Sequence, residues 1–281
     1  MKTRKLISSI AKGMMMITAV IAVLACQPAA GTMVSGTAAK GPVNGATVEI
    51  YALSEDGTRG ELLATVTAGT EGDFAADIGD YAGALAVVVT GGSYVDEASG
   101  ETVTLGDSDE LETLLASTEE PGSVAVTALT TIAAAQASAN AADGLDTVIA
   151  NANSDVADTF GLSEVDISSV IPSDMSEDAT ADSSSQQQYG AVQAGLTQVA
   201  EDNSLAPADV LDLVDAMAQD FEDGSFDGTD AAGNALDTAL SITPEQAMNG
   251  LNTAIENFMN SSENKSGVNL SELGIDLPSV P

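Results

Sequence analysis

The chain has 281 residues and contains no histidine, no tryptophan and a single cysteine, Cys26. Without histidine, Ser-His-Asp triads and histidine-ligated zinc sites are excluded. One cysteine cannot form an intrachain disulfide, so packing alone has to stabilise the fold. An enzyme built on this chain would need a carboxylate pair or a Ser-Lys dyad. We therefore expect a protein that is not an enzyme.

Basic residues are also scarce, with 7 Lys and Arg against 43 Asp and Glu. Four of the seven lie in the first 25 residues, which hold no acid, so the remainder carries a net charge of 3 − 43 = −40. Such a surface repels phosphate backbones, which excludes nucleic acid as a partner, and it attracts cations and basic proteins. A second interpretation of the acidity is solubility in a salty exterior. Aromatic residues make up only 3% of the chain, which argues against a sugar-stacking cleft.

The first 25 residues have the layout of a secretory signal, because Lys2, Arg4 and Lys5 precede an apolar stretch from Met14 to Ala25. This stretch is too short to span a membrane, which takes about 20 residues. We expect residues 1–25 to be removed on export. The alternatives are an uncleaved anchor, or an ordinary signal in which the following cysteine is coincidental.

The end of this segment, Val23-Leu-Ala-Cys26, resembles a bacterial lipobox. The resemblance implies a lipoprotein in which Cys26 carries diacylglycerol and a further acyl chain such as palmitate, with residues 26–33 as a tether. Two or more chains hold a protein stably on a bilayer. Gln27 stands where inner-membrane lipoproteins would have Asp, which favours the outer membrane. The expected partners are the membrane, through this lipid, and an envelope or surface protein.

Residues 34–105 read as short strands separated by glycine turns. Ala46–Leu53 alternates apolar and polar residues, and Ala84–Thr90 is almost continuously apolar. This pattern predicts a small antiparallel β-sandwich of about seven strands.

Within this region, the segment from Ser35 to Val48, followed by Leu63-Ala-Thr-Val-Thr and Glu71-Gly-Asp-Phe74, resembles the carboxypeptidase regulatory-like domain. The resemblance covers about a quarter of the chain. It implies a transthyretin-like or Ig-like sandwich with a supporting role and no catalysis. Related pilin modules contain an internal Lys-Asn bond, which we do not expect here, because Lys40 falls in a turn instead of inside a strand. A Ser-Lys dyad is not expected either, because Lys40 and Lys265 both fall in polar turns, which are poor places to desolvate an amine.

Residues 106–262 change to a helical period and predict an all-α domain, so the expected class is α+β. Thr127 or Ser123 is suited to cap the first helix. The polar stretch at about 172–188 predicts an exposed loop, and residues 263–281 form a tail whose leucines we expect to dock. The predicted helices are 126–137, 145–160, 187–200, 207–221, 231–240 and 244–259.

One acidic segment between two predicted helices resembles an EF-hand loop. Asp223, Ser225 and Asp227 occupy its first, third and fifth positions, but Asn234 stands at the twelfth, where a bidentate glutamate is needed. One interpretation is a weak calcium site, and calcium is the only cofactor that the sequence suggests. The other is a solvated turn between helices, which the failed twelfth position favours.

These observations together predict a non-catalytic envelope lipoprotein, anchored in the outer membrane, that acts as a binding or structural module. Two alternatives stay open. One is a carboxylate-dependent hydrolase acting on an envelope polymer, which requires two carboxylates in a shared cleft, at least one with a raised pKa. The other is a carrier of calcium or of a small ligand, which requires a pocket or a formed loop at Asp223–Asn234.

Overall fold

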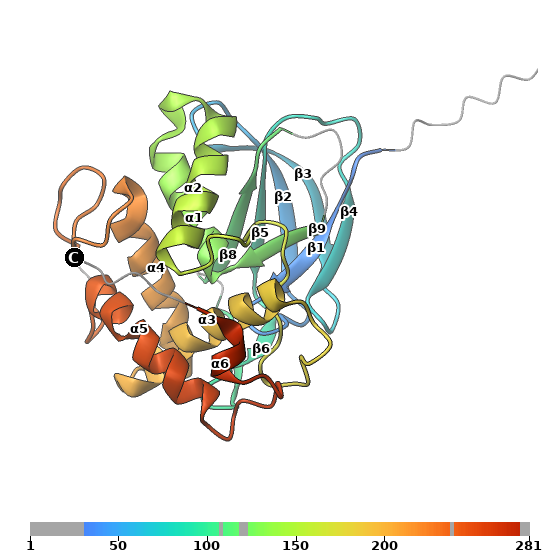
Figure 1. Ribbon diagram of the computed structural model, residues 1–281. Helices are drawn as coiled ribbons and strands as arrows, with labels where there is room; N and C mark the ends of the chain where they lie inside the picture. The colour runs from blue at the N-terminus through green and yellow to red at the C-terminus, as the bar shows by residue number, and fades with distance from the viewer. Residues whose placement is uncertain (1–30, 107–108, 118–122, 237–238, 276–281) are drawn as a thin grey trace, which may run out of the picture. The chain divides into compact units, whose positions relative to one another are not determined.

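The computed structural model describes residues 31–106, 109–117, 123–236 and 239–275. Strands occupy the first part of this chain (Figure 1). Cys26 and the predicted signal lie outside these residues. The strands are β1 (Met33–Ala39), β2 (Thr47–Leu53), β3 (Arg59–Thr67), β4 (Asp73–Asp77), β5 (Leu85–Thr90), β6 (Ser93–Val95), β7 (Thr102–Thr104), β8 (Glu110–Leu115) and β9 (Ser123–Thr127).

The strands form two main sheets and a small hairpin. One sheet is antiparallel with the order β3-β2-β5-β8, and the hairpin is β6-β7. The other has the order β4-β1-β9, in which β1 runs antiparallel to β4 and parallel to β9. Gly36 permits the close approach of β1 and β9, since a Cβ atom on it would lie 2.1 Å from the carbonyl oxygen of Val124.

The strands predicted at 46–53 and 84–90 are confirmed as β2 and β5. Residues Leu85–Val89 are all buried, because β5 is an inner strand of its sheet. The expectation that residues 106–262 are all helical was wrong at its start, since β8 and β9 are strands. Leu111, Leu114 and Leu115 have helical spacing, but pairing with β5 decides their conformation.

Helices occupy most of the remainder. They are α1 (Ala128–Ala139), α2 (Leu145–Thr159), α3 (Ser184–Asp202), α4 (Val210–Asp220), α5 (Pro244–Met259) and α6 (Leu270–Leu273), with 3₁₀ turns at Ala141–Asp143, Pro207–Asp209 and Phe221–Asp223. Thr127 caps α1 and Pro244 begins α5, as the sequence predicts. The class is therefore α+β.

The helix predicted at 231–240 is not present in the described residues of that range, 231–236 and 239–240. Asp230 Oδ1 accepts hydrogen bonds from the backbone N–H groups of Ala232 and Asn234, and Gly233 has a φ of +77°. Thr229 and Ala235 then form an isolated β-bridge. Asp230 thus bonds backbone N–H groups that a helix would otherwise use, and a turn forms where helical periodicity predicted a helix.

The loop predicted at 172–188 is confirmed only up to its residue 183, because α3 begins at Ser184. Ser183 and Gln186 form a capping box that starts the helix early. The loop is also less exposed than expected, since Met175 and Ala179 are buried. In the tail, Leu273 is buried, and its carbonyl oxygen accepts a hydrogen bond from Gln188 on α3.

The described residues from 31 onward form one compact unit, whose hydrophobic core is continuous from the strands into the helices. Helix α1 packs on β8 and β9, and α3 packs on α5 (Figure 1). Gly195 permits the second contact, since a Cβ on it would lie 2.4 Å from Ile255 Cγ1. Among the described residues, no helix is long and apolar enough to cross a membrane.

Candidate functional site

Lys40 lies in the turn that follows β1, and it is fully buried with 0% exposure. Ala39 and Pro42 form a β-bridge across this turn, and Gly41 takes a φ of +63°. A Cβ on Gly41 would lie 2.9 Å from the carbonyl oxygen of Val95. Glycine therefore lets the turn fold tightly against β6, and this directs Lys40 into the protein.

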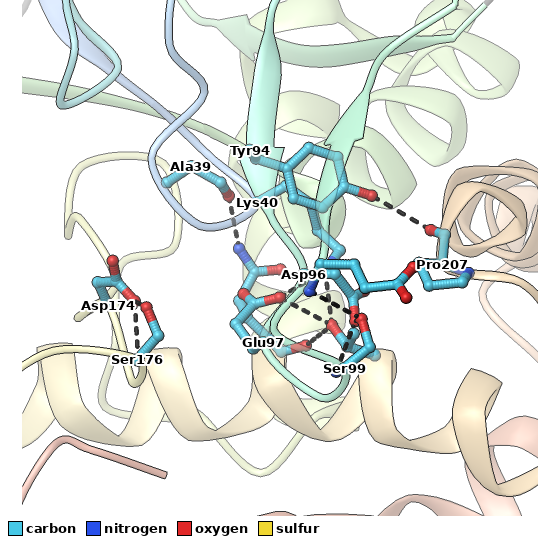
Figure 2. Close-up of polar contacts among 12 residues, drawn as sticks. Ala39, Lys40, Tyr94, Asp96, Glu97, Ser99, Asp174, Ser176 and Pro207 are labelled. Carbon is cyan, nitrogen blue, oxygen red and sulfur yellow. Dashed lines mark hydrogen bonds and ion pairs between the residues drawn. The ribbon is translucent and has the colours of Figure 1, made fainter. Parts of the chain in front are cut away.

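The amine of Lys40 is held by groups that come from distant parts of the chain. Lys40 Nζ donates to Glu97 Oε2 at 3.0 Å and to Thr197 Oγ1 at 2.6 Å, and Thr197 Oγ1 lies 3.0 Å from Glu97 Oε2. The ring of Tyr94 faces the amine, with 5.3 Å between Nζ and the ring centroid. We call Lys40, Glu97 and Thr197 the Lys40 cluster, of which Figure 2 labels Lys40 and Glu97.

The Lys40 cluster joins the β strands to the middle of α3. Glu97 follows β6, whereas Thr197 belongs to α3. One turn earlier on the same helix, Gln193 Nε2 donates to the carbonyl oxygen of Ala39 at 2.8 Å. Two side chains of α3 therefore hold the β1 turn, so this buried network fixes where the helix packs on the strands.

The charge of Lys40 is retained in this setting. Burial lowers the pKa of the amine, but the nearby Glu97, Tyr94 and Asp96 outweigh burial and raise the pKa above its ordinary value of 10.5. The ion pair with Glu97 is therefore a buried pair in which the amine keeps its charge. Such a pair is costly to desolvate, and good geometry with additional hydrogen bonds has to offset that cost.

Asp96 is a second buried carboxylate beside the Lys40 cluster, with 1% exposure. Its Oδ1 accepts hydrogen bonds from the Ser99 backbone N–H at 2.9 Å and the Ser99 hydroxyl at 2.6 Å (Figure 2). Its Oδ2 is buried and has no hydrogen-bond partner in the described residues. Burial raises the pKa of Asp96, although Lys40 and Ser99 oppose this shift.

Asp96 lines a cleft of about 170 Å³ between the β6-β7 hairpin and helices α3 and α4, which we call the Asp96 cleft. Its buried lining also includes Thr197, Ala200 and Val210. Half-buried Leu205 and Pro207 form an apolar wall. The exposed carboxylates Glu101 and Glu201 complete the lining, together with Ser99.

The environment expected for Lys40 was wrong. The polar sequence Lys40-Gly-Pro-Val-Asn-Gly45 does form turns, but the amine is desolvated by groups that are 57 and 157 residues away in sequence. Asp96, Glu97 and Thr197 did not stand out among the candidate residues. The one available signal was that Lys40 is among only three basic residues after residue 25.

The predicted calcium residues do not converge in the structure, where each is bonded within the loop. Asp223 Oδ1 accepts hydrogen bonds from Ser225, both from its N–H at 3.0 Å and from its hydroxyl at 2.7 Å. Asp227 Oδ1 accepts from Thr229, and Asn234 Nδ2 donates to Asp230. Among the described residues, no group of three or more Asp, Glu or Cys is placed to hold a metal ion. Calcium binding stays a prediction.

The loop that contains these residues is held by contacts of Phe226 and Asp220 with the protein interior. Phe226 packs between Phe221 and Phe160, with ring centroids 4.8 Å and 6.3 Å away. Asp220 is fully buried, and its Oδ1 accepts hydrogen bonds from the N–H groups of Asp227 and Gly228 at 3.1 and 2.8 Å. The loop therefore has a structural explanation that needs no ion.

Three larger grooves lie elsewhere on the described surface, and the smallest of them, of about 230 Å³, lies between α5 and α6. One of about 640 Å³ runs between the end of β8, α2 and residues 163–168, and one of about 950 Å³ includes Asp56 and Asp146. Hydrogen bonds from Thr58 and Ser117 lower the pKa of these two carboxylates, which is the wrong direction for a general acid. A general acid needs a raised pKa, and among these carboxylates Asp96, which lines the smaller cleft, has one.

Comparison with known proteins adds no further identification: no protein family, curated protein or solved structure matches this chain. The candidate site consequently stands on its own geometry.

Proposed function

We propose that this chain is an exported lipoprotein of the outer membrane, whose folded part is a non-catalytic binding or structural module. The observation that carries the proposal is the position of Cys26. It is the only cysteine, it ends an apolar segment that follows basic residues, and β1 begins at Met33 only seven residues later. A lipid on Cys26 would hold the sheet close to the bilayer.

We also propose that the two main sheets are a sandwich of the carboxypeptidase regulatory-like kind. Support comes from their shared core, to which Val34 of β1 and Val48 of β2 both contribute. The chain departs from the pattern expected for such a domain in the parallel pairing of β1 with β9, which extends the strand region to Thr127.

The anchor is tested by metabolic labelling with a palmitate analogue, followed by membrane fractionation. We expect the wild-type protein to carry the label and to sediment with the outer membrane. The Cys26→Ser variant should lose the label and become soluble. The matched control is Gln27→Asp, which keeps the acylated residue and should keep the label while moving the protein to the inner-membrane fraction. A Cys26→Ser protein that stays bound to membranes would contradict the lipid anchor.

The carboxylate-dependent hydrolase remains the second candidate, because Asp96 has a raised pKa and shares its cleft with Glu101 and Glu201. The size of the cleft argues against this function. Sites for drug-sized ligands usually measure about 300–1,000 Å³, whereas the Asp96 cleft measures about 170 Å³ and is too small for a unit of a polymer. Hydrolysis of envelope glycan that is lost in Asp96→Asn but retained in Asp158→Asn would revive the hydrolase.

A further inference from the structure

The buried Oδ2 atom of Asp96 accepts no hydrogen bond from the described residues. Buried carboxylate oxygens are ordinarily hydrogen-bonded, because desolvating them without a partner is costly. Among the described residues, Ser99 donates to Oδ1 alone, and Lys40 forms its ion pair with Glu97. The structure thus leaves one carboxylate oxygen of Asp96 unmatched where Asp96 lines a cleft.

A single bridging water does not account for the space. One water takes about 30 Å³ of liquid volume, and the cleft measures about 170 Å³. The cleft is nevertheless smaller than a site for a drug-sized ligand. Its volume suits a short molecule with few non-hydrogen atoms.

The charges around the cleft select a cation. Lys40 forms its ion pair with Glu97 and also acts electrostatically on Asp96, so one positive charge faces two buried acids. Glu101 and Glu201 add two more negative charges, and no basic side chain is part of the lining. A site in which acids are separated by apolar wall residues fits a ligand with two cationic ends and an aliphatic middle.

We propose that the Asp96 cleft binds a short aliphatic diamine. One ammonium group donates to Asp96 Oδ2, and the other lies near Glu101 and Glu201. The methylene groups between them pack against Leu205 and Pro207. This proposal specifies the binding role proposed above, but it does not depend on the lipid at Cys26, so loss of membrane attachment in Cys26→Ser would leave it standing.

The test is calorimetric titration of 1,4-diaminobutane into the unlipidated chain from Gln27 to Pro281. This chain keeps the whole hydrophobic core, whose members lie between Val34 and Leu273. We expect saturable binding of one diamine per chain, in dilute buffer and also with sodium chloride at physiological ionic strength. Heat that disappears with added salt would show general attraction to an acidic surface and would overturn the proposal.

Two variants locate the ligand. Asp96→Asn keeps an acceptor for Ser99 but removes the charge, and it should weaken binding about tenfold or more, as expected for a lost charge-assisted hydrogen bond. The matched control is Asp158→Asn, which removes one charge from the exposed side of α2 and should bind like the wild type. Equal affinity in the two variants would overturn the proposal.

A third variant covers the case in which Asp96→Asn fails to fold. Glu201→Gln changes an exposed cleft residue and should weaken the diamine while leaving 1-aminobutane, which lacks the second ammonium group, almost unaffected. An identical loss for both amines would contradict the two-ended arrangement. Displacement of the diamine by millimolar calcium, but not by magnesium at the same ionic strength, would instead assign the cleft to a metal ion and would also overturn the proposal.

Discussion

Two acidic regions of this protein, the Asp220–Asn234 loop and the surroundings of Lys40, differ in where their carboxylates find hydrogen-bond donors. In the Asp220–Asn234 loop, Asp223, Asp227 and Asp230 accept hydrogen bonds from groups two to four residues away. In the Lys40 cluster, Glu97 is paired with an amine 57 residues away in sequence. The first region has a visible sequence pattern and the second has none. The comparison teaches that closely spaced acids readily accept hydrogen bonds from groups a few residues away. A buried site, in contrast, is assembled from residues that are distant in sequence.

The two regions also share one feature. Asp96 and Asp220 are both buried, and each has one oxygen that is held by neighbouring donors and one that has no partner in the described residues. Burial raises the pKa of both carboxylates. Asp96 lines a cleft that combines further acids with apolar walls, whereas Asp220 accepts hydrogen bonds from N–H groups of its own loop. This difference is why the proposed ligand site is at Asp96.

The largest expected effect is that of Lys40→Met. It leaves Glu97 buried without a counter-charge, and breaking a buried ion pair in this way costs about 3–5 kcal/mol of unfolding free energy. Urea unfolding at neutral pH measures the change. The control is Lys265→Met, which removes an exposed pair with Glu263 at 3.5 Å and should cost less than about 1 kcal/mol. Equal losses in the two variants would show that the Lys40 cluster does not hold the fold.

Thr197→Val should have a smaller effect, because it keeps the shape of the side chain but removes the hydroxyl that accepts from Lys40. We expect a loss of about 1–3 kcal/mol in urea unfolding, since a buried donor is left with one partner fewer. Thr253→Val on the exposed side of α5 is the matched control and should change little. A neutral Thr197→Val would mean that Glu97 alone suffices for the amine.

The pH dependence of stability should distinguish Asp96 from surface acids. Its raised pKa means that the folded state binds the proton more tightly than the unfolded state. Asp96 therefore favours folding at acid pH, and this contribution is lost as pH rises through its folded pKa. Asp96→Asn should flatten the decline in unfolding free energy from about pH 4 to neutrality. The measurement is the urea midpoint of each variant across this pH range, with Asp158→Asn as the control. If Asp96→Asn and Asp158→Asn showed the same pH dependence, the assignment to Asp96 would be contradicted.

The smallest effect is expected at the acidic loop. If its carboxylates serve only as turn acceptors, millimolar calcium should raise the melting temperature no more than magnesium at the same ionic strength, and Asp223→Ala and Asp227→Ala should not alter that result. A calcium-specific rise that both variants abolish would instead establish the ion site that the sequence suggests. It would also reverse the contrast between the two regions.

Local patterns predicted many of the elements. Alternation found β2, a continuous apolar run found β5, and Pro244 marked the start of α5, because these signals act over one strand or one turn. The same reasoning failed at β8, where leucines at helical spacing joined a sheet, and at residues 231–236, where Asp230 captured backbone donors. Pairing with β5 decided the conformation of β8, whereas side-chain-to-backbone hydrogen bonds over two to four residues decided that of residues 231–236.

The candidate site was predicted less well. The sequence shows Lys40 only as a lysine in a polar turn, and no local pattern distinguishes Asp96 or Thr197 from their neighbours. Among 43 acidic residues, sequence alone gives no reason to prefer Asp96 over an acid on the surface. The pairing of α3 with the β1 turn is a long-range contact, and no periodicity reports it.

The amino-acid sequence by itself determined which histidine- and disulfide-based chemistries this protein lacks, where the proposed export and acylation signal would lie, and the excess of acidic residues. These properties follow from composition and from signals within a few neighbouring residues. Only the tertiary structure decided that Lys40 is desolvated, that the acids of the Asp220–Asn234 loop bond to their own backbone, and that Asp96 lines a cleft. Burial and electrostatics depend on which groups meet in space, and that is settled when α3 packs on the strands.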